Sequence, residues 1–258
     1  MSTIPTGTFV WYELMSTAPE RAGAFYTELF GWTIESADMG GDAPYTAIKL
    51  GDKWVGGVMP LDAAHGTPSH WMNYISVPDV DAACAQIVAL GGKVNVPAFD
   101  IPTIGRTAFV QAPDGSVFAP FSSSSEPPPS EGPPPAGTFC WQQLQAKDLD
   151  ATVAFYTTVF GWTVEEMPAG GPRTVGFKAG DKMVATAMAM PTEVPAPTHW
   201  QSYVAVEDIN AVYARAQGLD ARSYHHPTEI PGMGTFAVLA GPDGAVFCLW
   251  QANDASNG

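Results

Sequence analysis

The pattern of apolar positions in the first part of the chain predicts the same order of elements twice. Alternating and aromatic residues over 9–14 predict a strand, and apolar residues at helical spacing over 20–30 predict a helix that ends at Gly31. Three short strands are expected over 33–39, 45–50 and 54–59. The order then recurs as a strand over 70–77, a helix over 79–90 and strands near 93–99, 106–111 and 117–121.

The second part of the chain repeats the first. Residues 9–32 read FVWYELMSTAPERAGAFYTELFGW, and residues 139–162 read FCWQQLQAKDLDATVAFYTTVFGW. Trp11 and Trp141 lie 130 positions apart, and His70 and His199 lie 129 positions apart. Two spacings that agree to within one residue indicate an internal duplication. The chain is therefore predicted to contain four βαβββ modules of an α+β fold.

A stretch rich in serine and proline separates the two repeats. Residues 122–137 read SSSSEPPPSEGPPPAG, which lacks core-forming side chains and favours an extended polyproline II spacer. We therefore predict a first domain over 1–121, a linker over 122–137 and a second domain over 138–258.

Composition and charge narrow the range of functions. Apolar residues make up 46% of the chain, and 26 acidic residues against 11 basic ones give a net charge of -15. Such a chain is unsuited to nucleic acid or to an anionic membrane surface, because both bind clustered Lys and Arg. The start shows no secretory signal pattern, so a cytoplasmic location is expected. Cys84, Cys140 and Cys248 are scattered and odd in number, which predicts reduced thiols and no disulfide framework.

Several motifs together resemble the vicinal oxygen chelate superfamily, which includes glyoxalase I, extradiol dioxygenases and fosfomycin- and bleomycin-resistance proteins. They are the FGW helix ends, the DVDA helix start over 79–82, the GG stop at 91–92 and the PDG turns. The stretches PAFDIPTIGR (97–106) and LWQAN (249–253) are similar to a narrower subgroup, the tandem two-domain glyoxalase-like proteins of actinobacterial type.

The resemblance implies two glyoxalase/bleomycin-resistance/dioxygenase-type domains, in which modules pair and their curved mixed sheets enclose a cleft. Whether the modules pair within each half or across the halves is left open. The resemblance does not imply one reaction, because this superfamily contains lyases, isomerases, oxygenases and proteins that only bind a small molecule.

The resemblance also implies where a divalent metal would be bound. The matching ligand positions are Trp11 and Trp141 in the first strand, Met72 and Gln201 in the fifth, and Ala119 and Cys248 in the last. The fourth strands, over 54–59 and 184–190, contain no carboxylate or histidine. Tryptophan and alanine cannot bind a metal, and methionine is a poor ligand for a hard ion. No metal and no other cofactor is therefore expected, with a divalent ion at a different set of ligands as the alternative.

Strand alternation predicts which side chains line each cleft. In the first strand Trp11, Glu13 and Met15 share one face, and Val10, Tyr12 and Leu14 share the other. The first cleft is predicted to be lined by Trp11, Glu13, Met15, Met72, Tyr74, Ala119 and Phe121. The second is predicted to be lined by Trp141, Gln143, Gln145, Gln201, Tyr203, Cys248 and Trp250. Apolar walls with a few polar groups are typical of ligand pockets, and a closed cleft filled by its own side chains is the alternative.

Glu13 is the sharpest candidate for chemistry. Burial would raise its pKa and suit it to proton transfer, or to pairing with a cationic ligand. Gln143 replaces it in the second half and cannot titrate, so the two clefts are expected to differ. Arg106 is the candidate charge partner near the first cleft, and a surface salt bridge is the alternative for it.

The histidines permit two interpretations. His70 and His199 each precede a tryptophan, where a histidine either starts a strand and caps its edge, or acts in the cleft as base, displaced ligand or hydrogen-bonding group. The local role is favoured. His225 and His226 are expected in an exposed loop.

Three hypotheses for function follow. The first is a monomeric or homodimeric protein that binds a small organic molecule without a metal. The second is a lyase, isomerase or oxygenase-type enzyme that acts on a carbonyl or quinone-type molecule, with a metal or with Glu13 as base. The third is an interaction protein whose clefts have closed.

Overall fold

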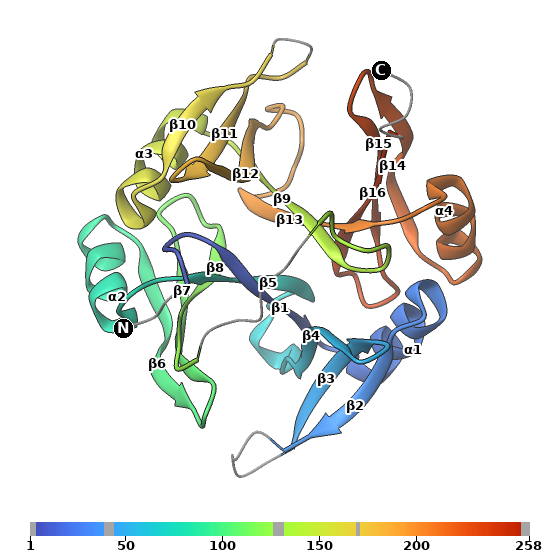
Figure 1. Ribbon diagram of the computed structural model, residues 1–258, viewed down its shortest axis with the longest axis horizontal. Helices are drawn as coiled ribbons and strands as arrows, with labels where there is room; N and C mark the ends of the chain where they lie inside the picture. Colours follow the sequence, from blue (N-terminus) through green and yellow to red (C-terminus); the bar gives the residue numbers. More distant parts are fainter. Residues whose placement is uncertain (1–3, 39–43, 126–131, 169–170, 254–258) are drawn as a thin grey trace.

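Each half of the chain forms one mixed sheet (Figure 1). The computed structural model describes residues 4–38, 44–125, 132–168 and 171–253. The first half contains β1 (Phe9–Ser16), β2 (Thr33–Ala37), β3 (Tyr45–Leu50), β4 (Lys53–Pro60), β5 (His70–Ser76), β6 (Lys93–Ile101), β7 (Gly105–Gln111) and β8 (Val117–Ser123). These eight strands lie in the order β2-β3-β4-β1-β5-β8-β7-β6.

The second half repeats this arrangement strand for strand. It contains β9 (Phe139–Ala146), β10 (Thr163–Glu166), β11 (Thr174–Ala179), β12 (Lys182–Ala189), β13 (His199–Ala205), β14 (Arg222–Ile230), β15 (Gly234–Ala240) and β16 (Val246–Ala252). Their order is β10-β11-β12-β9-β13-β16-β15-β14. The predicted α+β fold, with βαβββ modules paired into two domains, is confirmed.

The modules pair within each half, at the first strand of each module. In the first half β1 is antiparallel to β5, and Glu13 lies opposite Met72. On its other side β1 is parallel to β4, and Glu13 lies opposite Gly57. Glu13 is therefore held in the middle of the sheet, where a side chain has neighbours on both flanking strands.

In the described part of the chain four helices connect the strands, and their ends follow from the sequence. They are α1 (Pro19–Phe30), α2 (Val80–Ala89), α3 (Leu149–Phe160) and α4 (Ile209–Gly218), and one 3-10 turn (Ala63–His65) precedes β5. The side chains of Asp79, Asp148 and Asp208 accept a hydrogen bond from the backbone N–H three residues on, as helix N-caps do. Gly31 and Gly161 end their helices at φ of 71° and 66°, a conformation that favours glycine. Among the described residues, no helix has the length and apolar character needed to cross a membrane.

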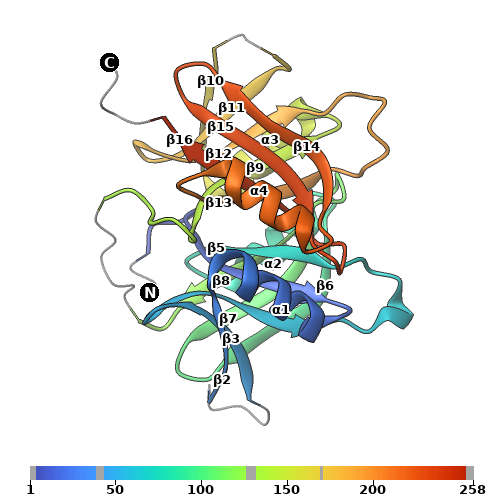
Figure 2. The same cartoon turned by 90° about the vertical axis from the view of Figure 1, so that its right-hand side faces the viewer.

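The helices lie along the boundary between the two sheets, and the two cores there are each built from both halves (Figure 2). In one core Ile87 and Phe118 pack with Tyr156 of α3, and the rings of Phe118 and Tyr156 are 5.5 Å apart. In the other, Tyr26 of α1 and Phe247 of β16 are also 5.5 Å apart. Since each of these two cores needs side chains from both halves, the two domains share them.

The tryptophans of the two repeated FGW motifs tie the halves together. The indole N–H of Trp32 donates to the backbone carbonyl of Gly137 at 2.7 Å, and that of Trp162 donates to the carbonyl of Gly7 at 3.2 Å. Gly7 has a φ of 81°, and a Cβ there would collide with the Trp162 ring. The tight approach of an indole to the opposite half therefore requires glycine at this position.

Two local expectations are wrong. Val10 does not share a face with Tyr12 and Leu14, because the pairing of β1 with β5 shifts register between Phe9 and Trp11. His225 and His226 do not lie in a loop but within β14, where two register shifts interrupt the pairing with β15.

Two predicted segments extend beyond the described residues. In the predicted linker, β8 continues to Ser123, and residues 126–131 lie outside the described part of the chain. In the predicted strand over 33–39, β2 ends at Ala37 and Met39 lies outside it as well.

Candidate functional site

The candidate site is the face of the first sheet that carries no helix. A separate apolar cluster covers this face, and none of its members comes from a helix. We call it the first helix-free face; it consists of Trp11, Glu13 and Met15 of β1, Met72 and Tyr74 of β5, and Ala119 and Phe121 of β8. The structure thus places all the side chains predicted to line the first cleft on one face, and Arg106, their predicted charge partner, lies elsewhere. Most are buried, and partly exposed apolar side chains such as Leu61, Ile101 and Ile104 surround them.

Glu13 is the acidic group of this face, and it is only 2% exposed. The hydroxyl of Tyr45 lies 2.9 Å from both of its carboxyl oxygens and donates to them. The Trp11 indole N–H donates in turn to the Tyr45 hydroxyl at 3.0 Å, and the Tyr74 hydroxyl lies 3.5 Å from Oε2 of Glu13. Hydroxyl and indole donors therefore surround the carboxyl, and among the described residues it forms no ion pair.

Burial in this apolar surrounding controls the protonation of Glu13. Loss of hydration raises the pKa of Glu13 from its ordinary 4.5 to about 8, although the Tyr45 hydrogen bond opposes the shift. Burial, with the Glu13 charge close by, also raises the pKa of Tyr45 and of Tyr74 well above the usual tyrosine value. Both tyrosines are therefore protonated donors at neutral pH, and Glu13 is the group on this face that can gain or lose a proton there.

Tyr45 and Gly57 are parts of this site that the sequence interpretation missed. Gly57 of β4 lies next to Glu13 of β1. A Cβ at Gly57 would collide with the Tyr45 hydroxyl and the Glu13 carboxyl. The absence of a side chain at Gly57 is what lets Tyr45 reach across from β3. The parallel pairing of β1 with β4 would have revealed both residues, but that pairing is not visible in the strand pattern alone.

The second helix-free face carries amides where the first carries a carboxyl. It consists of Trp141, Gln143, Gln145, Gln201, Tyr203, Cys248 and Trp250. The Gln145 side chain donates to Gln143 at 2.9 Å and to Gln201 at 3.0 Å. Tyr203 donates to the oxygen of Gln143 at 3.0 Å, and burial raises the pKa of the Cys248 thiol. This network is neutral and holds its own hydrogen bonds.

The two faces also differ in the residue that the neighbouring parallel strand, β4 or β12, places beside the central side chain. Thr186 stands opposite Gln143 in the second half, as Gly57 stands opposite Glu13 in the first. Its hydroxyl accepts from the Trp141 indole at 3.2 Å and from Gln143 at 3.3 Å. Like the Tyr45 hydroxyl, the threonine hydroxyl accepts from the tryptophan indole, but it accepts from Gln143, whereas Tyr45 donates to Glu13.

His70 is the first residue of β5, and its side chain lies on the same face of the strand as those of Met72 and Tyr74. Its Nδ1 is 2.9 Å from the carbonyl of Pro68, and burial lowers its pKa below 6.5. Its Nε2 is buried and has no hydrogen-bond partner among the residues that the structure describes. His199 makes the matching contact with Pro197 at 2.8 Å. Both histidines thus contact the proline carbonyl two residues before them, and this contact leaves Nε2 of His70 unused.

Arg106 is not part of the site. Its guanidinium contacts Asp81 of α2 at 2.8 Å and Asp100 of β6 at 2.9 Å, both exposed carboxylates. It therefore lies on the helix side of the sheet and forms the surface salt bridges that were the alternative for it. The expected pairing with Glu13 is not formed, because Arg106 alternates with the buried Thr107 along β7 and points to the opposite face.

The residues at the implied metal positions do not fit a divalent ion. The first helix-free face presents an indole, a thioether and a methyl group there, from Trp11, Met72 and Ala119. The second presents Gln201 and a buried Cys248 thiol whose raised pKa opposes the thiolate form that binds metals. Among the described residues, no three His, Cys, Asp or Glu side chains lie close enough to hold an ion.

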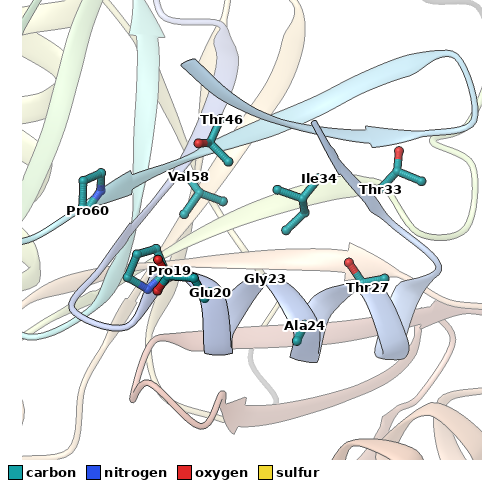
Figure 3. A pocket seen from close by; sticks show the side chains of 10 residues that line it. All are labelled: Pro19, Glu20, Gly23, Ala24, Thr27, Thr33, Ile34, Thr46, Val58 and Pro60. Atoms are coloured by element: carbon teal, nitrogen blue, oxygen red, sulfur yellow. The ribbon is translucent and has the colours of Figure 1, made fainter. Parts of the chain in front are cut away.

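Two surface grooves lie outside these faces. One has a volume of about 650 Å³ and runs between α1 and the strands β2, β3 and β4 (Figure 3). Its lining is Pro19, Glu20, Gly23, Ala24, Thr27, Thr33, Ile34, Thr46, Val58 and Pro60. The other, about 460 Å³, lies where the end of α1 meets the start of α4. Among the described residues that line the first groove, Glu20 is the only ionisable one, so the chemistry of this groove does not match that around Glu13.

Comparison with known proteins places this geometry in context. The family model described as "Glyoxalase/Bleomycin resistance protein/Dioxygenase superfamily" matches residues 8–119 and 139–249. The protein named "Putative glyoxylase CFP32" of Mycobacterium tuberculosis is 36% identical over 247 residues, which cover 94% of each chain. The "Anthracycline biosynthesis protein DauV" of a Streptomyces species is 27% identical and covers 99% of this chain and 97% of its own.

Solved structures share the arrangement of both halves. The 2,3-dioxygenase LapB of Pseudomonas sp. KL28 matches with a TM-score of 0.65 at 14% identity, covering 97% of this chain and 94% of its own. A Mn(II)-bound glyoxalase of Novosphingobium aromaticivorans matches with a TM-score of 0.62 at 17% identity, and the match covers 97% of this chain and 83% of the glyoxalase. At these identities the likeness concerns the fold.

Proposed function

The chain belongs to the glyoxalase/bleomycin resistance protein/dioxygenase superfamily, and from this we propose that its first helix-free face binds a small aromatic molecule without a divalent metal. The observation that carries the proposal is the buried Glu13 carboxyl, which has hydroxyl donors but no cationic partner among the described residues. Burying a carboxyl without a cation is costly, and a ligand that supplies a positive or strongly hydrogen-bonding group offsets this cost.

The surroundings of Glu13 favour an aromatic ligand. Tyr74 packs edge-on against Phe109 and Phe121, each with its ring centroid 6.2 Å away. Met15 and Met72 flank the carboxyl along the same face. Methionine side chains adapt to different shapes and make favourable contacts with aromatic rings. Met15 and Met72 can therefore move aside so that a planar molecule fits against the first helix-free face. Two relatives are named for anthracycline biosynthesis, and their names agree with an aromatic ligand.

The second helix-free face suits a different ligand. Its amides and hydroxyls satisfy one another and carry no charge, so a neutral polar molecule would have to replace existing hydrogen bonds. We therefore propose that the charged or amine-bearing ligand binds in the first half and that the second half does not bind it.

A second candidate function is proton transfer by Glu13. Its pKa of about 8 is near neutral pH, where a general base is most effective. In this case Glu13 would remove a proton from a carbon next to a carbonyl group, and Tyr45 and Tyr74 would keep the carboxyl in place. Relatives that carry the word glyoxylase or glyoxalase in their names support an enzyme of this kind.

Calorimetry with phenethylamine, an aromatic ring with one ammonium group, tests the binding proposal. Wild type should bind it saturably at one site, and Glu13→Gln should weaken binding roughly tenfold or more, because a charge-assisted hydrogen bond is lost. Gln143 shows that a glutamine fits the matching position. Glu20→Gln, which removes an exposed charge from the same half, is the matched control.

Three results would contradict the proposal. They are no saturable binding, equal binding by wild type and Glu13→Gln, and binding that disappears after removal of divalent ions with a chelator. Binding that survives Glu13→Gln but is lost in Gln143→Leu would assign the amine to the second half instead.

A further inference from the structure

His70 holds a ring nitrogen that no role described so far explains. His70 lies opposite Met15 on β1, two positions along from Glu13 and on the same face. Side chains in such a diagonal relation are about 7–8 Å apart at the backbone. On these two strands Glu13 and His70 are therefore diagonal neighbours, and the apolar side chains of Met15 and Met72 occupy the other two positions of the same group of four.

The local hydrogen bonds fix the state and direction of the His70 ring. Because the Pro68 carbonyl can only accept, Nδ1 of His70 carries the hydrogen at 2.9 Å from it. In the neutral ring Nε2 is then an acceptor with a free lone pair. Next to His70, the Ser69 hydroxyl accepts from the backbone N–H of Thr17 at 3.1 Å, which anchors the segment to the end of β1. The ring is therefore held in place before any ligand arrives.

Burial makes this nitrogen unusual. Buried polar atoms are almost always hydrogen-bonded, so a buried atom without a protein partner needs an explanation, and a bound ligand is one. Nε2 of His70 has no partner among the described residues, whereas Nε2 of His199 is not among the buried unpaired atoms. The two halves share the Pro-x-His segment and its ring contact, so the local structure does not account for the difference.

We propose that Nε2 of His70 is the second polar anchor of the first helix-free face and accepts a hydrogen bond from a hydroxyl group of the aromatic ligand whose amine meets Glu13. This inference rests on the proposed function. The ligand class is an aromatic amine that also carries a hydroxyl at the far end of the ring. Its apolar middle contacts the methionines, and its two polar ends meet one acceptor each.

Three matched amines test the inference on the full chain. Tyramine carries both polar groups, phenethylamine lacks the hydroxyl, and 4-methoxyphenethylamine has the same oxygen without its hydrogen. Wild type should bind tyramine about fivefold more tightly than either of the others, the size expected for one net hydrogen bond. His70→Phe keeps a ring of similar size and should reduce this preference to about one, with phenethylamine binding retained. His199→Phe, the matched change in the second half, should leave the preference unchanged.

A second measurement does not depend on the variant folding. In wild type labelled with nitrogen-15, the Nε2 resonance of His70 should move upfield when tyramine is added and stay in place with 4-methoxyphenethylamine. Equal affinities for tyramine and phenethylamine, or a preference that persists in His70→Phe, would overturn the inference while the Glu13 proposal stands. A resonance that tyramine does not move, as for a nitrogen already bonded to a buried water, would overturn it too. If none of the amines binds, both proposals fail.

Discussion

Glu13 and Gln143 occupy the same position in the two sheets, each at the centre of its helix-free face. Glu13 stands between Gly57 and Met72, and Gln143 stands between Thr186 and Gln201. The duplicated scaffold therefore presents one ionisable face and one neutral face. An amide nitrogen in place of one carboxyl oxygen accounts for this difference, because an amide does not ionise near neutral pH.

Glu13→Gln should change how stability depends on pH. In the folded state burial raises the pKa of Glu13 to about 8, whereas in the unfolded chain it is about 4.3. Between these values the folded state binds more protons than the unfolded state, so the free energy of unfolding falls as pH rises. Relative to Glu13→Gln, wild type should lose about 1.4 kcal/mol per pH unit between pH 5 and pH 8. Urea unfolding across this range measures the difference.

Glu20→Gln is the control for this prediction, since Glu20 is exposed in the first turn of α1. Its unfolding free energy should follow that of wild type at every pH. Parallel curves for wild type and Glu13→Gln would mean that the carboxyl is ionised in the folded protein at pH 5, contrary to its raised pKa.

Binding of phenethylamine should strengthen with pH. The ammonium group needs ionised Glu13, and below about pH 8 most of the folded protein has this carboxyl protonated. The affinity should therefore rise about tenfold per unit between pH 6 and pH 7.5, where the amine stays charged. Calorimetry in buffers of different ionisation enthalpy should detect about one proton released per amine bound at pH 6.5. An affinity that is constant with pH would show that the amine does not meet Glu13.

Gly57→Ala should disrupt the site without any change to its polar groups. The added Cβ collides with the Tyr45 hydroxyl, so Tyr45 must withdraw from Glu13. We expect a loss of about 1–3 kcal/mol in the free energy of unfolding, as for overpacking of a filled core, and weaker binding of phenethylamine. Gly218→Ala is the control, because a Cβ at Gly218 meets nothing within 4 Å. Unchanged binding in Gly57→Ala would show that Tyr45 is not needed.

The two halves should unfold together. The core that contains Tyr26 and Phe247 and the core that contains Phe118 and Tyr156 each join both halves. Residues 1–125 alone would expose the apolar side of their sheet and should fail to fold, whereas co-expression with residues 132–258 should restore a folded complex. Urea unfolding of the full chain should give one transition by fluorescence and by circular dichroism. Two separate transitions would show that each half is stable by itself.

The order of elements could be predicted from the sequence because the signals that begin and end each element are short-range. A glycine that ends a helix, or an aspartate that begins one, acts within a few residues, and so does apolar spacing. Because the chain is duplicated, these signals occur in both halves. The faces of the strands also followed from alternation, except at Val10, where a register shift interrupts it. Such shifts depend on the partner strand, so one strand's own sequence does not reveal them.

The chemistry of the site was only partly predictable, since it depends on contacts between strands. Glu13 could be identified by its position, but Tyr45 reaches it only because β4 has a glycine at Gly57. Arg106 is the candidate charge partner near the first cleft by sequence, but its side chain points to the helix side and pairs with Asp81. The free Nε2 of His70 follows from a ring contact with Pro68, and sequence alone does not show which nitrogen that contact uses.

Hydrogen–deuterium exchange next to a carbonyl group tests whether Glu13 is also a base. If it is, the chain should accelerate exchange of the methyl protons of acetophenone in D2O, because the carboxylate removes a proton from that carbon and a deuteron then replaces it. The rate should rise with pH up to about 8, where Glu13 becomes ionised, and level off above it. Glu13→Gln should reduce the rate to that of the solution without protein, and Glu20→Gln should keep the wild-type rate. Acceleration that survives Glu13→Gln would assign the proton transfer to another group, and no acceleration in wild type, with amine binding intact, would leave binding as the function of this face.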